Sequence, residues 1–176
     1  MWNSSSAQQH QLFHAACLLK QFSLLKADQQ GVLESCADAA TLAVLAAMVS
    51  DELVAPVDDR SEFAAEKQAR LATLCGGAPS RQTLMADLVS KDVVASCSKT
   101  VSTFFEAFQN LNSSVCISSF SVFANNENLA KYSNSLRRGL FVKTIAHMQG
   151  MYSCVGFEKF AALTNDILPF ESMGMT

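Results

Sequence analysis

Proline positions constrain the fold of this chain more than any other single feature. Its 176 residues contain only three prolines, and each follows the end of a helix-periodic segment: Pro56, Pro79 and Pro169. Proline disfavours helical geometry in the residue before it, so helices usually stop ahead of such positions. Between the prolines, apolar residues recur mostly at helical spacing. We therefore predict an all-α protein, a single compact helical bundle of six to eight helices spanning residues 1–176, with loose ends at 1–5 and 171–176.

The predicted helices follow one another with short connections. They cover residues 6–27 and 32–54, a third segment from 58 to the glycine pair at 76–77, and a fourth from Ser80 to a break near 90–92. Later helices are expected around 101–111, from 126 onward, and over 155–168. Residues 113–124 mix periods of two and three. A lone strand there would have no partner elsewhere, which favours helix or irregular structure.

A kink or break is expected at Gly139. The apolar face of the helix from residue 126 shifts its direction at this glycine. Arg137 and Arg138 come directly before it, and basic residues suit the negative end of a helix. The same two arginines belong to the densest basic cluster of the chain: Lys131, Arg137, Arg138 and Lys143. We predict that this cluster binds phosphate or the acidic residues of a partner, the alternative being a solvated helix end.

The balance of apolar and charged residues suggests that part of the surface is covered. Hydrophobic residues make up 49% of the chain and charged ones 16%, against about 25% charged in typical soluble domains. The first helix is apolar over most of its circumference, apart from a strip with His10, His14 and Gln21, so we expect it in the centre or in an interface. Four phenylalanines form the predicted partner-binding surface, against the alternative that they are core: Phe104, Phe108, Phe120 and Phe123.

Charge, cysteine spacing and apolar run length each disfavour one class of protein. A net charge of −3 argues against general nucleic-acid binding, which is not favoured. The six cysteines have no CxxC spacing and no secretory signal precedes them, so we expect free thiols in the reducing cytoplasm. The longest apolar run is Ala39 to Val49, too short for the roughly 20 residues of a membrane span. We therefore predict no membrane span.

Candidate catalytic and metal-binding groups are few. His10, His14 and Cys17 share one side of the first helix at metal-ligand spacing, but no good fourth ligand accompanies them. Cys154 and Cys97 are the nearest approaches to an activated thiol, and both suit a core role better. The adjacent acids at 51–52 and 58–59 are better explained by helix starts than by acid–base chemistry. We therefore predict no cofactor, no metal and no enzymatic activity.

The favoured hypothesis is a non-enzymatic α-helical protein that acts through protein–protein contact or assembly and self-associates. Two alternatives remain. One is a small helical coat or nucleocapsid-type protein that holds RNA with Arg137 and Arg138. The other is a helical bundle that encloses an apolar ligand pocket, because phenylalanine and methionine are abundant.

Overall fold

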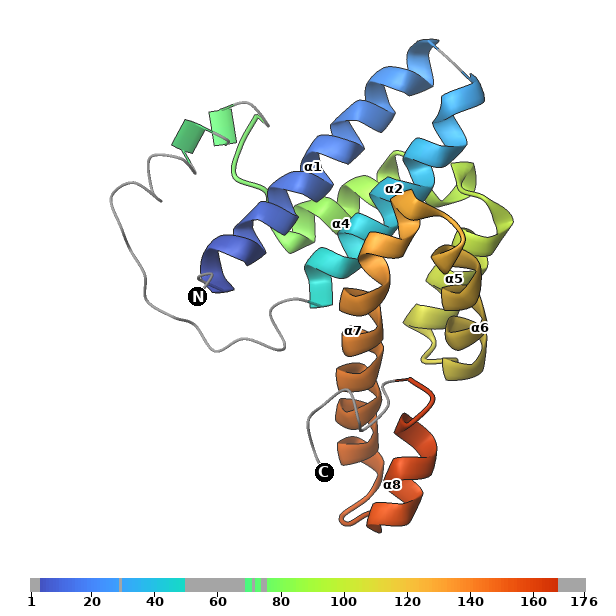
Figure 1. The fold of residues 1–176 in the computed structure, drawn as a ribbon. Coiled ribbons are helices and arrows are strands. Elements are labelled where there is room, and N and C mark those ends of the chain that lie inside the picture. Colours follow the sequence, from blue (N-terminus) through green and yellow to red (C-terminus); the bar gives the residue numbers. More distant parts are fainter. Residues whose placement is uncertain (1–3, 29, 50–68, 71, 74–75, 168–176) are drawn as a thin grey trace. The chain divides into compact units, whose positions relative to one another are not determined.

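The part of the chain that the structure describes is α-helical, which confirms the predicted fold class. The computed structural model describes residues 4–28, 30–49, 69–70, 72–73 and 76–167. Seven bounded α-helices and one short 3-10 helix lie in these ranges, and no strand does (Figure 1). The elements are α1 Ser4–Asp28, α2 Gln30–Val49, α4 Arg81–Ser90, η1 Val94–Ser96, α5 Lys99–Gln109, α6 Ser113–Ala124, α7 Glu127–Met151 and α8 Phe157–Thr164. The chain divides into two compact units, Met1–Ser102 and Thr103–Thr176.

Unit 1 is built around a hairpin of two long helices. α1 and α2 pack against each other in antiparallel directions, and α4 packs on both (Figure 1). Leu19 and Phe22 of α1 are buried, as is nearly all of α2 between residues 36 and 47. The buried side chains of α2 are mostly small, among them Ala37, Ala40, Ala43, Ala46 and Ala47. Small side chains let the backbones of neighbouring helices approach closely, so α2 serves as the core helix of unit 1.

A buried carboxylate of α2 fixes the start of α5. Asp38 is 7% exposed, and its Oδ1 accepts a hydrogen bond of 2.8 Å from the Ser98 backbone N–H. The Ser98 hydroxyl in turn accepts a bond of 3.4 Å from the N–H of Val101, in the first turn of α5. These contacts satisfy amide groups that have no partner within the helix. The helix therefore begins at Lys99, directly after Ser98.

Three helix ends turn through a residue with positive φ. Gly76 has a φ of 80°, and the next amide, that of Gly77, donates to Ala72 O at 2.8 Å, which confirms the predicted stop at this glycine pair. Asp92 after α4 and Leu111 after α5 have φ values of 55° and 56°. The amide that follows each of them bonds back to a carbonyl five residues earlier. This is the Schellman arrangement, and the end of α4 at Ser90 confirms the predicted break near 90–92.

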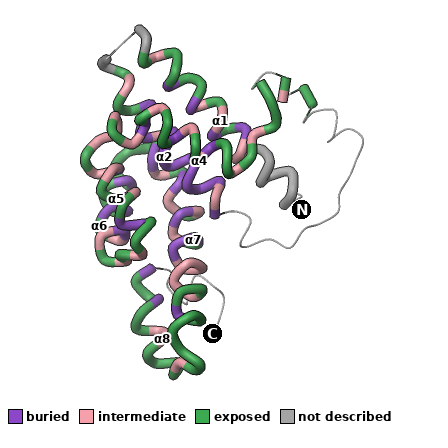
Figure 2. Tube along the Cα trace, turned by 180° about the vertical axis from the view of Figure 1, so that it is seen from behind, coloured by how far each residue is buried: buried purple, intermediate pink, exposed green. Residues whose placement is uncertain are grey.

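Unit 2 is a hairpin of α7 and α8 with a layer formed by α5 and α6. α6 packs on α7, and its observed bounds Ser113–Ala124 resolve the ambiguous stretch as helix. α8 folds back along the C-terminal half of α7, where the rings of Phe141 and Phe160 lie 6.3 Å apart in an edge-on geometry. Figure 2 shows that most of α8 is exposed, in contrast to the buried face of α7.

Helix α7 does not break at Gly139, which corrects that part of the prediction. It runs from Glu127 to Met151 without interruption, and Gly139 is buried on the same helix as Leu136 and Leu140. A glycine within a helix costs about 1 kcal/mol relative to alanine. Burial of the surrounding apolar side chains outweighs that cost. The N-terminal end is corrected as well, since Ser4 and Ser5 belong to α1 instead of a loose end.

Several predictions concern residues outside the described ranges. These are the helix end before Pro56, most of the third helix, the acids at 51–52 and 58–59, Cys75 and the tail at 171–176.

One described segment has the length and composition of a membrane span. Val32–Val49 has a mean hydropathy of 1.7, and 67% of it is buried inside the protein. A core helix of a folded domain has the same properties, and the burial of α2 against α1 and α4 is typical of such a helix.

Candidate protein-binding surfaces

The four phenylalanines predicted to bind a partner lie in the interior of unit 2. Phe104 is at the centre, with its ring centroid 5.6 Å from Phe108, 5.4 Å from Phe120 and 5.1 Å from Phe123. All four are at most 2% exposed. Edge-on ring pairs at these distances add to the stability gained by burial. A partner could reach these rings only by opening the helices, so the predicted surface is corrected to an aromatic core.

Two of the four predicted basic residues are held on that aromatic core. The Arg137 guanidinium lies 4.7 Å from the ring centroid of Phe120, and its Nη1 donates to Ile167 O at 3.4 Å. Lys143 Nζ lies 4.7 Å from the ring centroid of Phe108 and donates to the carbonyl of the same residue at 3.4 Å. Both side chains are only partly exposed. Their positive charges therefore stabilise the fold of unit 2 through ring faces and backbone carbonyls.

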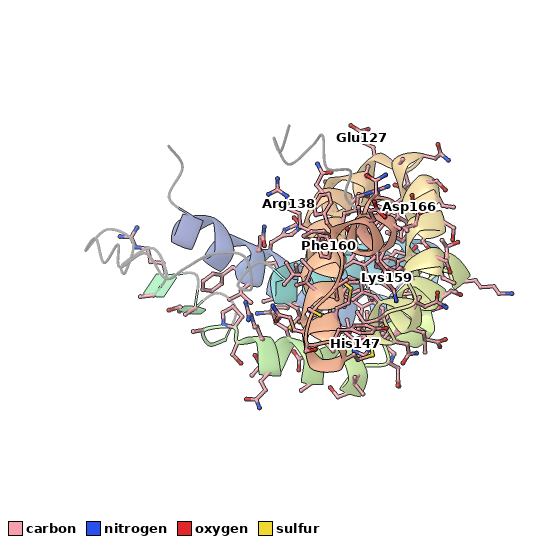
Figure 3. The ribbon with its side chains drawn as sticks, turned by 90° about the horizontal axis from the view of Figure 1, so that it is seen from below. Glu127, Arg138, His147, Lys159, Phe160 and Asp166 are labelled. Carbon is pink, nitrogen blue, oxygen red and sulfur yellow. The ribbon has the colours of Figure 1, made fainter. Side chains whose placement is uncertain are left out.

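The other two basic residues face solvent. Lys131 and Arg138 are exposed and lie seven residues apart on one unbroken helix, so they share one face of α7. Lys131 Nζ lies 5.0 Å from the ring of Tyr132, and Arg138 is labelled in Figure 3. Lys131 and Arg138 form the basic pair of α7.

The outer side of α1 is more exposed than its apolar composition predicts. One face of the helix, including Phe13, Leu19 and Phe22, is buried. The opposite side exposes a strip that we call the α1 strip: His14, Cys17, Lys20, Gln21 and Leu24. Leu24 is 66% exposed, the largest apolar side chain of this strip, and composition alone did not mark it. Leu24 follows Gln21 by three residues and Cys17 by seven, and this helical spacing could have predicted that Leu24 shares the exposed side with them.

The metal and nucleophile candidates take different positions. The described residues contain no group of three or more histidine, cysteine or acidic side chains placed to hold a metal ion. His14 and Cys17 lie in the α1 strip, and the side chain of His10 is outside the described part. Cys154 is exposed in the connection between α7 and α8.

Cys97 is a half-buried thiol whose pKa lies well above its ordinary value. Burial raises the pKa of Cys97 to about 12, and a hydrogen bond with Thr41, whose Oγ1 lies 3.1 Å from the sulfur, only partly lowers it. The reactive form of cysteine is the thiolate. Cys97 therefore fits the core role that its sequence context favoured, next to the Asp38–Ser98 contact that starts α5.

A comparison with known proteins finds that the chain matches one protein family. A family described as eIF3a, PCI domain, TPR-like region matches residues 5–115. No curated protein and no solved structure matches the chain. The matched stretch contains the α1–α2 hairpin, α4 and α5, and it ends three residues into α6.

Proposed function

Because this match covers more than half of its residues, the chain belongs to the family of the eIF3a PCI domain, TPR-like region, and we propose that it is a non-enzymatic helical scaffold in an intracellular, translation-related assembly. Its partners are proteins. The observation that carries the proposal is the family match over a stretch whose first two helices form a packed hairpin.

The physics of helical-pair proteins supports a binding role for unit 1. In tetratricopeptide-type folds, helix pairs stack on one another, and the side of the stack that neighbours leave open forms the surface for partners. In unit 1, α2 is buried in the core, whereas α1 exposes the side chains of Gln21 and Leu24 on one side. The α1 strip combines polar side chains with the exposed Leu24. Such a mixture suits a protein partner, with an apolar anchor inside a polar rim.

The basic pair of α7 supports a second contact, with an acidic protein surface. Lys131 and Arg138 are exposed, whereas Arg137 and Lys143 are only partly exposed and contact Phe120 and Phe108, so Lys131 and Arg138 present their positive charges to solvent. Two exposed cations are few for holding a nucleic-acid backbone, and the net charge of the chain is −3. An acidic patch on a protein partner matches this pair better than RNA does.

The cysteines agree with an intracellular setting. Within the described residues, no disulfide joins Cys17, Cys36, Cys97, Cys116 or Cys154. Free thiols, exposed ones included, are typical of proteins that work in a reducing compartment.

Sedimentation of cell extracts through a sucrose gradient tests the proposal. We expect the tagged chain to travel with large translation-related complexes and to stay there after RNase treatment, because protein contacts hold it. Leu24→Glu should weaken this association by about tenfold or more and move the chain to light fractions. Lys131→Glu with Arg138→Glu should give a smaller loss that grows with salt. Ser23→Glu adds the same charge beside Leu24 on a different side of α1 and serves as the matched control.

Two results would contradict the proposal. If the wild-type chain stays in the light fractions, it is not bound to a large assembly, and the scaffold role is wrong. A chain that RNase releases is bound through RNA, which would favour the nucleocapsid-type alternative.

A further inference from the structure

Helix α8 carries an exposed stripe that no other described element covers. Lys159, Ala162, Leu163 and Asp166 are all exposed, with Leu163 at 46%. Their spacing of three, four and seven residues places them on one side of a helix. The opposite side packs inward through Phe160 and the buried Thr164. We call these four residues the α8 stripe; Lys159, Phe160 and Asp166 can be located in Figure 3.

The helical path continues far enough to include Asp166. α8 ends at Thr164, but Asn165 keeps helical angles of −60° and −35°, and its amide donates to Ala161 O at 2.9 Å. The amide of Ile167 donates to Thr164 O at 3.0 Å, so the turn beyond the helix stays closed. Asp166 therefore lies about 10 Å along the axis from Lys159, at the other end of the stripe.

The two charged ends of the stripe are not neutralised within the described part of the unit. Neither Lys159 nor Asp166 makes an ion pair there. Within the described residues, the ammonium group of Lys159 lies over the ring of Tyr152, whose centroid is 5.4 Å from Nζ. One positive end and one negative end thus flank two apolar side chains, Ala162 and Leu163.

The order of these four side chains makes the α8 stripe complementary to a second α8 stripe that runs in the opposite direction. If two stripes lie antiparallel with the centre between positions 162 and 163, Lys159 faces Asp166 of the second copy, and Asp166 faces the second copy's Lys159. Ala162 faces Leu163 in the same way, so a small side chain meets a large one at both positions. We propose that α8 pairs antiparallel with α8 of a second copy of this chain.

Charge and size both select the antiparallel orientation. A parallel pair in register would set lysine against lysine and aspartate against aspartate, which is repulsive, and would set leucine against leucine. A two-fold symmetric contact of this kind is the commonest way in which identical chains associate. Two helical turns bury less area than the roughly 1,600 Å² of a standard interface, so the dimer forms reversibly with concentration. The exposed ion pairs make it weaker at high salt.

Analytical ultracentrifugation of the full chain over a range of concentrations, at low and high salt, tests the pairing. The wild-type chain should show a monomer–dimer equilibrium. Asp166→Lys places lysine against lysine at both ends and should weaken the dimer about tenfold or more, as should Lys159→Asp. The double variant Lys159→Asp with Asp166→Lys exchanges the two charges and should restore dimerisation to within about threefold of the wild type. Glu158→Lys reverses an exposed charge of α8 outside the stripe and should leave the dimer unchanged.

Circular dichroism melting of each variant keeps the result interpretable, since the altered side chains are exposed and the folds should be equally stable. A monomer at all concentrations overturns the pairing, because the stripe is then covered by another part of the chain or by a different protein. A dimer that Asp166→Lys leaves intact overturns it too, because the contact lies elsewhere. The pairing does not rest on the α1 strip or the basic pair of α7, so either proposal can fail alone.

Discussion

The two units reach the same helical architecture with opposite kinds of core. In unit 1 the central helix α2 buries a series of alanines and brings its neighbours close. In unit 2 four phenylalanine rings fill the space between α5, α6 and α7, with ring centroids 5.1 to 6.2 Å apart for the closest edge-on pairs. The buried side chains of α2 are thus mostly small, whereas those at the centre of unit 2 are large aromatic rings. We therefore expect unit 2 to lose stability when a core side chain is made smaller. Unit 1 should lose stability when a buried alanine is replaced by a larger side chain.

Polar groups are also used differently in the two cores. Unit 1 buries the Asp38 carboxylate and directs it at the backbone amide of Ser98. Unit 2 keeps its charges at the edge, where Arg137 and Lys143 lie over the rings of Phe120 and Phe108. The carboxylate of Asp38 holds a backbone amide in place by a hydrogen bond. Arg137 and Lys143 instead cover phenylalanine rings at the edge of the core while their charged groups stay near solvent.

The largest effect should come from emptying the aromatic core. Phe104→Ala removes the ring that contacts Phe108, Phe120 and Phe123, and we expect the free energy of unfolding of unit 2 to fall by about 3–5 kcal/mol. Urea titration followed by circular dichroism measures the loss. Phe105→Ala, next in sequence and only half-buried, is the control and should cost clearly less. Equal losses for both variants would mean that the ring cluster adds nothing beyond ordinary burial.

A smaller effect should come from overfilling the other core. Ala40 is fully buried on α2, and Ala40→Leu should lower the free energy of unfolding of unit 1 by about 1–3 kcal/mol, because α2 must move away from its neighbours. The same urea titration applies. Ala86→Leu, on the exposed side of α4, is the control and should be nearly neutral. If Ala40→Leu were stabilising, the core of unit 1 would contain unfilled space.

The smallest effect should be a loss of stability at alkaline pH that both units share. Burial raises the pKa of Cys97 in unit 1 to about 12 and that of Cys116 in unit 2 to about 11, where Lys143 partly lowers it. The unfolded chain ionises both thiols near their ordinary pKa of 9.0, while the native chain keeps them protonated. The stability is therefore fully present below pH 9 and falls as pH rises toward these raised values.

Urea titrations at several pH values between 8 and 11 measure this loss. Cys97→Ala should make the profile less steep. An unchanged slope in Cys97→Ala would mean that other groups cause the alkaline loss.

Helical periodicity predicted the elements of this protein better than it predicted what each face contacts. Residues 113–124 could be assigned to helix because a lone strand would lack a partner, and α6 has those bounds. The phenylalanines at 104, 108, 120 and 123 were expected at a surface, since an apolar face looks the same in a core and in an interface. Their mutual contacts between α5 and α6 depend on tertiary packing, which a single sequence does not display.

The basic residues illustrate the same limit. All four lie on α7, as the sequence places them, but only the structure separates Arg137 and Lys143 from Lys131 and Arg138. The separation depends on which rings of α5 and α6 lie within reach. The predicted break at Gly139 had the same origin, because the cost of one glycine is local and the burial that offsets it is not.

The position of the aromatic core also decides where this chain can be shortened. The family match ends at residue 115, and the two compact units meet within α5, so neither border coincides with the end of a helix. A recombinant fragment that stopped at 115 would lose Phe120 and Phe123 and leave the rings of Phe104 and Phe108 bare to solvent. Such a fragment would be expressed as an aggregate. Soluble pieces of this protein must keep α5, α6 and α7 together.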